Sequence, residues 1–102
     1  MSIDYEFDWD DAKAAANEAK HGVTFLQAMT VLSDELALTV YDTEHSQDEE
    51  RWLSLGQTSE GSLLVVIHTF VETGLSSALL RIISARPATK SERKQYEQGL
   101  AH

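Results

Sequence analysis

The sequence predicts an α+β fold in which two N-terminal helices precede a four-stranded antiparallel sheet and a last helix ends the chain. Apolar residues recur at helical spacing up to about residue 32, and four short runs rich in leucine, aromatic and β-branched residues follow from residue 36. A helix-start pattern then follows Pro87, the only proline. The 102 residues suffice for a single domain, residues 1–102, with one modest core.

Two helices are predicted at the N-terminal end. Asp10 can cap the first, and Gly22 is placed to end it. Between them, four alanines recur at i, i+3, i+4 and i+7: Ala12, Ala15, Ala16 and Ala19. Thr24 and Gln27 form a capping-box pattern that opens a second helix. Its buried side is expected to carry Phe25, Ala28, Met29 and Leu32.

Four strands are predicted next, from the runs LALTVY, RWLSLGQT, LLVVIHTFV and SALLRIISA. The connections are short enough for neighbouring antiparallel strands, so we expect a β-meander with helices on one face and the other face partly open. Residues 5–7 give the weakest strand pattern and would add one short N-terminal strand. Pro87 ends the last strand, and Thr89 with Glu92 forms a second capping box for a helix through about Leu100.

The composition excludes several classes of protein. The chain has no cysteine, which excludes disulfides, thiolate zinc sites and cysteine nucleophiles. Its acidic start does not resemble a signal peptide, and no apolar run is long enough to span a membrane. We therefore expect a cytoplasmic protein with no membrane partner.

Charge is distributed unevenly along the chain, whose net charge is -9. Residues 1–75 hold three lysines and arginines against fifteen acids, whereas residues 76–102 hold five against two. This asymmetry indicates either one basic surface on an acidic body or solvated cations on the last helix.

No motif for a metal or a cofactor is present. There is no glycine-rich phosphate loop, no nucleophile elbow and no histidine pair at metal-ligand spacing. His45 lies in an acidic run, but the run lacks the spacing and glycine of a calcium loop, so a solvated acidic loop is expected there.

Three polar residues lie in otherwise uncharged predicted strands: Arg51, His68 and Arg81. If Ser59 and Glu60 are the two loop residues of the first hairpin, Arg51 falls opposite His68, and Arg81 lies within about two residues of that row. One stripe would then hold all three. The alternatives are ion pairs from the arginines to the acidic loop or to Glu92, and a buried histidine with satisfied hydrogen bonds.

RNA cleavage without a metal needs a base for the 2′-hydroxyl, cationic donors for the phosphorus-bound oxygens and an acid for the leaving 5′-oxygen. His68 can act as base or acid near neutral pH, and arginines can supply forked donors to phosphate. Tyr96 shares a helix face with Arg93 and can stack on RNA or, alternatively, pack the helix against the sheet.

Four segments of the chain resemble the BrnT toxin family, and together they span nearly the whole chain: FDWDDAKAAANEAKHGVTFLQA at 7–28, DTEHSQDEERWLSLG at 42–56, LLVVIHT at 63–69 and RIISARPATKSERKQY at 81–96. The resemblance implies a RelE-like ribonuclease that blocks translation by cutting RNA. It also implies a BrnA antitoxin as the neutralising partner, which binds operator DNA.

The family's polar positions fall on eight residues of this chain: Lys20, His21, Arg51, His68, Arg81, Arg86, Arg93 and Tyr96. We assign Arg51, His68, Arg81, Arg86 and Tyr96 to catalysis. Lys20, His21 and Arg93, with Lys90 from the basic end of the chain, are assigned to RNA binding. No metal ligand and no cofactor is assigned.

Two features depart from the family's pattern. Pro87 stands where family members often carry a lysine, and the net charge of -9 repels RNA at long range. These departures favour an alternative, a non-catalytic interaction module kept to bind an antitoxin or to regulate an operator. A third hypothesis is an inhibitor that occupies the ribosome without cutting RNA.

Overall fold

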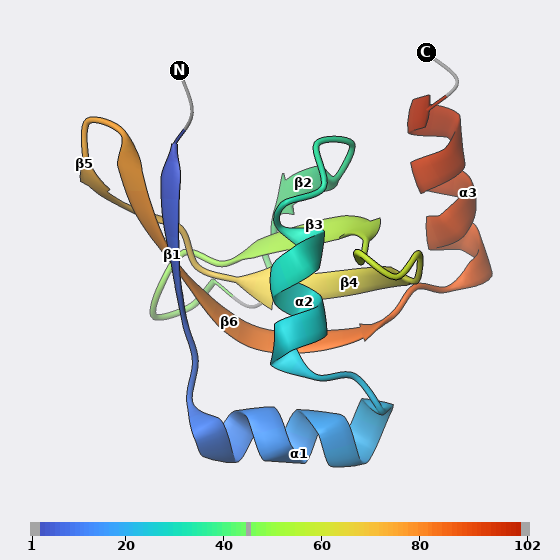
Figure 1. The fold of residues 1–102 in the computed structure, drawn as a ribbon, viewed down its shortest axis with the longest axis horizontal. Coiled ribbons are helices and arrows are strands. Elements are labelled where there is room, and N and C mark those ends of the chain that lie inside the picture. Colours follow the sequence, from blue (N-terminus) through green and yellow to red (C-terminus); the bar gives the residue numbers. More distant parts are fainter. Residues whose placement is uncertain (1–2, 45, 101–102) are drawn as a thin grey trace.

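A computed structural model describes residues 3–44 and 46–100, which form three helices and six strands (Figure 1). In chain order these are β1 (Asp4–Asp8), α1 (Asp11–His21), α2 (Phe25–Val31), β2 (Leu38–Tyr41), β3 (Trp52–Gln57), β4 (Leu63–His68), β5 (Val71–Gly74), β6 (Ser77–Pro87) and α3 (Lys90–Leu100). His45, in the predicted acidic loop, lies outside the described residues. No helix in the described ranges is long and apolar enough to cross a membrane.

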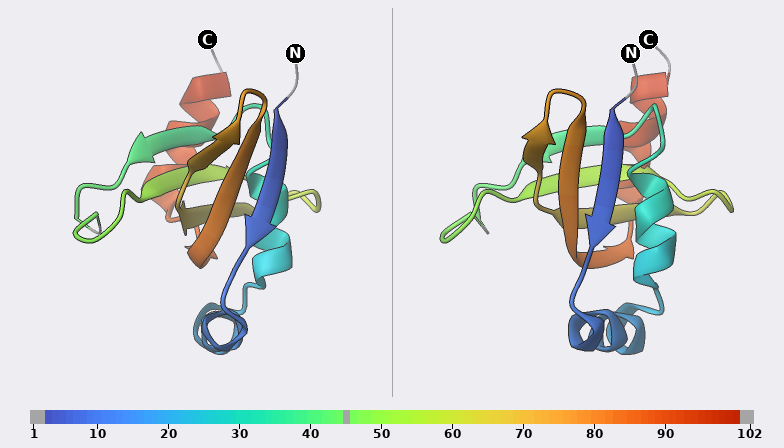
Figure 2. Two further views of the ribbon diagram at one scale, coloured as in Figure 1. Left: turned by 90° about the vertical axis from the view of Figure 1, so that its left-hand side faces the viewer. Right: turned by 60° about the vertical axis from the view of Figure 1, so that its left-hand side comes forward.

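The sheet is mixed, with strand order β1-β6-β4-β3-β2 and with β5 also paired to β6. The predicted meander is present, because β2, β3, β4 and β6 are antiparallel neighbours. The predicted count of four strands is wrong. The run 63–71 breaks after His68 into β4 and β5, and β5 folds back on the first half of β6. Figure 2 shows β6 bending from the β1 and β5 side of the sheet toward β4.

β1 is the weakly predicted N-terminal strand, and it pairs in parallel with the first half of β6. A parallel pair needs a long crossover connection. Here α1, α2 and the first three meander strands all lie between the two partners in the chain. Local sequence patterns do not report such a distant pairing.

The β3–β4 hairpin differs by one residue from the predicted register. Trp52, and not Arg51, lies opposite His68. The cause is the loop, in which Gln57 pairs with Leu63 and the amide of Thr58 donates to the carbonyl of Ser62. The number of residues between the paired Gln57 and Leu63 is odd, whereas the predicted loop of Ser59 and Glu60 requires an even number between paired residues. Gly61 in this loop adopts a φ of 95°, a conformation that favours glycine. A shift of one residue moves a side chain to the other face of the sheet.

The predicted helix ends are confirmed. The Asp10 carboxylate accepts from the amide of Ala12 at 2.8 Å, and Gly22 ends α1 with a φ of 68°. Thr24 and Gln27 form the complete capping box of α2. The four alanines of the predicted stripe are exposed, however, and the helix instead turns Asn17 and Ala14 toward the core.

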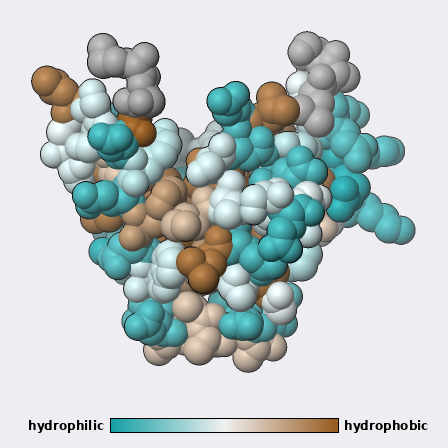
Figure 3. All heavy atoms as spheres, viewed as in Figure 1, coloured by the Kyte–Doolittle hydropathy of each residue, from teal (hydrophilic) through white to brown (hydrophobic). Residues whose placement is uncertain are grey.

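One core lies between α2 and the sheet, with α1 at its lower edge in Figure 1. Its buried residues are Val23, Phe25, Ala28, Val31, Leu64, Val66, Ile82 and Ala85. Asn17 joins α1 to β6, since its amide donates to the carbonyls of Val23 and Ala85 and accepts from the Ala85 amide. On the same side of the molecule, Figure 3 shows apolar residues gathered in the middle and hydrophilic residues over α3, on the right.

A second, smaller core lies on the opposite face of the sheet, under α3. Tyr96 packs there against Leu55, Leu63 and Val65, whose side chains alternate with those of the first core. The expectation that all helices cover one face is therefore wrong. Because α3 covers one end of this face, the other end stays open.

Candidate functional site

Three arginines share the open face of the sheet. The carbonyl of Arg51 accepts from the amide of Asp42, so Arg51 extends β3 and points to the same face as Leu53. Arg86 pairs with Val65, which packs under α3. Arg81 lies between Leu80 and Ile82, which are buried on the other face, so it points to the open face as well.

A groove of about 290 Å³ lies on this face. It is lined by Asp42, Glu44, Arg51, Leu53, Ile67, Ile83, Ser84 and Arg86. A bulge in β6 helps to form it, because Ile67 pairs with Ser84 while His68 pairs with Ile82, which leaves Ile83 as an extra residue.

Glu49 lies between two of the arginines. Its carboxylate is 3.5 Å from Nη2 of Arg51 and 3.7 Å from Nη1 of Arg81. The side chains of Arg51, Arg81 and Glu49 are 28%, 51% and 38% exposed, so each pair contributes about 1 kcal/mol or less. The alternative prediction of ion pairs to the acidic loop is therefore confirmed for these two arginines.

The Nε atom of Arg51 is buried and has no hydrogen-bond partner among the residues that the structure describes. A buried donor without an acceptor costs roughly 1–3 kcal/mol. Arg51, which lines the groove, therefore has a donor that no described residue satisfies.

Arg86 is held firmly by Glu92, with two parallel hydrogen bonds of 2.8 and 2.9 Å. These bonds raise the pKa of Arg86 and hold the pKa of Glu92 at about 2. Glu92 also accepts from the amide of Thr89, which completes the predicted capping box of α3. Arg86 therefore keeps its charge and orientation at the groove.

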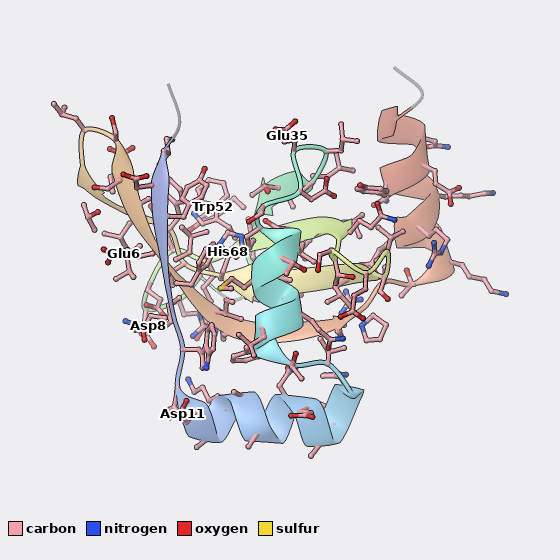
Figure 4. All side chains as sticks on the ribbon, in the orientation of Figure 1. Glu6, Asp8, Asp11, Glu35, Trp52 and His68 are labelled. Carbon is pink, nitrogen blue, oxygen red and sulfur yellow. The ribbon has the colours of Figure 1, made fainter. Side chains whose placement is uncertain are left out.

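His68 lies on the face opposite the arginines and is 3% exposed. Figure 4 shows it near Trp52, between β1 and α2. Its Nδ1 lies 3.0 Å from the carbonyl oxygen of Thr69 and therefore carries the proton. Nε2 then accepts from the hydroxyl of Ser54, which in turn accepts from Thr39.

Burial lowers the pKa of His68, so the ring is neutral at pH 7. The predicted stripe is wrong for this residue, because the hairpin register places His68 on the other face from Arg51. Its environment matches the alternative, a buried histidine with satisfied hydrogen bonds.

Tyr96 is 4% exposed and points into the core beneath α3. Its hydroxyl donates to Oδ2 of Asp34 at 2.7 Å, in the connection between α2 and β2. Burial and this carboxylate raise the pKa of Tyr96 to about 12. Burial raises the pKa of Asp34, but hydrogen bonds from Gln57, Tyr96 and Leu36 outweigh it and lower the pKa overall. Tyr96 therefore matches the packing alternative.

The four residues predicted to bind RNA lie at two helix ends. Lys20 and His21 form the last turn of α1, and Lys90 and Arg93 lie at the start of α3. All are exposed except His21, which is half-buried. Both helix ends lie on the same side of the molecule, on the right in Figure 1, beyond the end of β6.

A larger hollow, of about 560 Å³, lies on the other side of Arg81. Its lining is mainly acidic, with Asp8, Asp10, Asp11 and Glu49 beside Lys13 and Arg81. Such a lining repels phosphate, so the groove between Arg51 and Arg86 is the better anion site. No group of histidines and carboxylates in residues 3–44 and 46–100 has the arrangement of a metal site.

The sequence prediction missed Glu49. A usable indication was present, since Glu49 and Arg51 are two residues apart and such residues share a face in extended chain. Ser54 and Thr39 were also missed, because their hydrogen bonds to His68 depend on the register of three strands.

Comparisons with known proteins identify the family. A family model described as the ribonuclease toxin BrnT of type II toxin-antitoxin systems matches residues 9–92. The 1.1 Å crystal structure of the Brucella abortus ribonuclease toxin BrnT is similar, with a TM-score of 0.57 and 28% sequence identity over 88% of this chain and 99% of that one. No curated protein sequence matches significantly. Because the family model matches most of its length, the chain belongs to the BrnT family of ribonuclease toxins of type II toxin-antitoxin systems.

Proposed function

We propose that the protein is a metal-independent endoribonuclease that inhibits translation by cutting RNA at the groove between Arg51 and Arg86, with Arg81 beside it. The observation that carries this proposal is the buried Nε of Arg51, which has no hydrogen-bond partner among the described residues, in a groove lined by a second arginine. Guanidinium groups match phosphate oxygens in geometry and charge. RNA is the phosphate-bearing substrate that the family description names.

A bound phosphate would take the position of the Glu49 carboxylate between Arg51 and Arg81. Both groups carry a single negative charge, and the existing contacts of 3.5 and 3.7 Å are weak enough to exchange. Arg86 remains on Glu92 and offers its other N–H donors to the same phosphate.

The reaction begins when the 2′-oxygen of the RNA attacks the adjacent phosphorus. The bond from phosphorus to the 5′-oxygen breaks, which gives a 2′,3′-cyclic phosphate and a 5′-hydroxyl end. Arginine donors stabilise the negative charge that builds up on the phosphorus-bound oxygens. In our proposal the displaced Glu49 carboxylate accepts the 2′-hydroxyl proton, and water supplies the proton of the 5′-hydroxyl.

His68 and Tyr96 receive a supporting role in this proposal. Neither lines the groove, and a direct role would require each to leave the hydrogen bonds described above. Lys20, His21, Lys90 and Arg93 would bind the RNA backbone beyond the end of β6, where their charges add a sequence-independent contribution.

Membership of a type II toxin family implies an antitoxin partner. We propose that this partner is a BrnA-like protein that neutralises the ribonuclease, and that operator DNA is contacted only through it. We also propose that the protein is related in fold to RelE toxins and that it acts in the cytoplasm.

The test is cleavage of a labelled total RNA by the purified protein in EDTA, beside Arg51→Ala and Arg81→Ala. Circular dichroism serves as the folding control for each variant. We expect the wild-type protein to cut and both folded variants to lose at least tenfold in rate. Cutting that needs an added divalent metal, or that survives both substitutions, would contradict the proposed site.

A second candidate function is antitoxin binding without catalysis. The observation that favours it is that all three arginines already contact carboxylates of the same chain. The RNA assay separates the two functions, because a non-catalytic module leaves RNA intact with and without metal while it still binds an antitoxin.

A further inference from the structure

β2 is an edge strand of the sheet. It pairs with β3 on one side, and no strand formed by residues 3–44 and 46–100 pairs with its other side. All four of its residues, Leu38 to Tyr41, are exposed, and Val40 is 56% exposed although it is apolar. Edge strands of this kind are templates for pairing with another chain.

The ladder shows which backbone groups of β2 are free. The amide of Asp42 donates to the carbonyl of Arg51, and hydrogen-bonded pairs recur at every second residue of an antiparallel ladder. Thr39 and Tyr41 therefore direct their N–H and C=O groups away from β3. Within the described residues, no other backbone group bonds to them. This edge therefore presents two N–H donors and two C=O acceptors at the spacing that a further strand would need to pair with β2.

The other outer strands of the sheet are protected against such pairing. β1 carries Asp4, Glu6 and Asp8, and Figure 4 shows the labelled Glu6 and Asp8 beside this strand. β5 has a charged residue, Glu72, and an irregular register against β6. Charges and bulges are the usual means of blocking an edge. β2 has the sequence LTVY, with no charge, no proline and no register shift.

The surroundings of β2 are acidic at both ends. Glu35 lies in the loop that enters β2, at the top of Figure 4, and Asp42 and Glu44 follow the strand. Antiparallel pairing of two copies would bring Glu35 of one copy near Asp42 and Glu44 of the other. Like charges at close range oppose this pairing, so the charge pattern suits a basic partner and disfavours a second copy.

We propose that β2 binds an extended segment of a protein partner, which adds a strand to the sheet. The segment has apolar residues at alternate positions, to cover either Leu38 and Val40 or Thr39 and Tyr41, and lysine or arginine at both ends. Main-chain hydrogen bonds provide affinity in this mode, and side chains provide specificity. The inference does not depend on RNA cleavage.

The test uses the full-length, isotope-labelled protein and two synthetic peptides that share an alternating valine and threonine core. One peptide has two lysines at each end, and the other has two glutamates. Amide chemical shifts locate the binding site, and titration gives the affinity. Two variants at one position separate backbone pairing from side-chain effects: Thr39→Pro removes the outward N–H, whereas Thr39→Val keeps it. Both lose the hydroxyl that bonds to Ser54.

The lysine peptide is expected to shift the amides of β2 and to bind the wild type and Thr39→Val equally. Thr39→Pro should bind roughly tenfold more weakly or not at all, in line with the loss of about 1.4 kcal/mol. Absent binding, shifts confined to other strands, equal binding to Thr39→Pro or equal binding of the glutamate peptide would each overturn the proposal. So would a dimer of the free protein that Thr39→Pro dissociates. If Thr39→Pro does not fold, the wild-type shifts and the two peptides decide the question.

Discussion

The buried ring of His68 accepts a hydrogen bond from the hydroxyl of Ser54, with 2.7 Å between Nε2 and Oγ. Because Nδ1 already donates to the carbonyl of Thr69, this bond requires the neutral ring. Protonation would turn Nε2 into a donor, so the Ser54 hydroxyl would have to reverse its hydrogen bonds to His68 and Thr39. Burial lowers the pKa of His68 and outweighs the hydrogen bond to Thr69, which raises it, so the ring is uncharged at pH 7 in the folded protein.

The stability of the protein should therefore fall as the pH is lowered from about 7 to 5. Burial lowers the pKa of folded His68 below its ordinary value of 6.5, so the unfolded chain binds the proton first. The stabilisation is present above pH 6.5 and is lost as the pH falls toward the folded pKa, at up to about 1.4 kcal/mol per pH unit. Urea unfolding of the wild type and of His68→Gln at several pH values measures it. Equal pH dependence of both proteins would contradict the prediction.

Glu92→Gln should destabilise the start of α3 by about 1 kcal/mol at pH 7. The side-chain oxygen of the glutamine can still accept from the backbone amide of Thr89, so the substitution mainly removes the ion pair with Arg86. The value is modest because the Arg86 side chain is 40% exposed. Glu97→Gln, an exposed position on the same helix, is the matched control.

The loss of stability caused by Glu92→Gln should also depend on pH. The pKa of Glu92 is about 2 in the folded protein, mainly through its hydrogen bonds to Arg86, against an ordinary value of 4.5. The advantage of the wild type is therefore complete above pH 4.5 and disappears as the pH falls toward 2. A difference in stability that stays constant down to pH 2 would show that the ion pair is not its source.

Tyr96→Phe should reduce the free energy of unfolding by about 1–2 kcal/mol and leave RNA cleavage unchanged. The substitution removes only the hydroxyl that donates to Asp34, and the amides of Gln57 and Leu36 still satisfy that carboxylate. Urea unfolding and the RNA assay on the same preparation separate packing from chemistry. A large loss of cleavage in a variant that is stable at the assay temperature would restore the catalytic role first assigned to Tyr96.

The sequence was sufficient to predict features that depend on neighbouring residues. All three helices and the meander follow from caps and apolar spacing within a few residues, such as Thr24 with Gln27. The parallel pairing of β1 with β6 and the break after His68 depend on residues far apart in the chain. No local pattern contains that information.

The candidate site was only partly predictable for the same reason. The arginines could be identified because charges are unusual within strands. The face on which His68 lies could not, because one extra loop residue in the β3–β4 hairpin reverses it. The ion-pair partner of each arginine depends on where the loop before β3 places Glu49 and on where α3 places Glu92.

Glu49→Gln distinguishes the two roles that the site gives to this carboxylate. The Glu49 carboxylate competes with RNA phosphate for the arginines, so neutralising it should lower the KM. The same carboxylate is the proposed base, so kcat should fall by roughly 10²–10⁴-fold in the variant. Steady-state cleavage of one defined RNA gives both constants, and Glu50→Gln provides a control of equal charge change in the same loop. An unchanged kcat with a lower KM would leave Glu49 as a competitor alone, and the base would then have to be sought among the residues that line the groove.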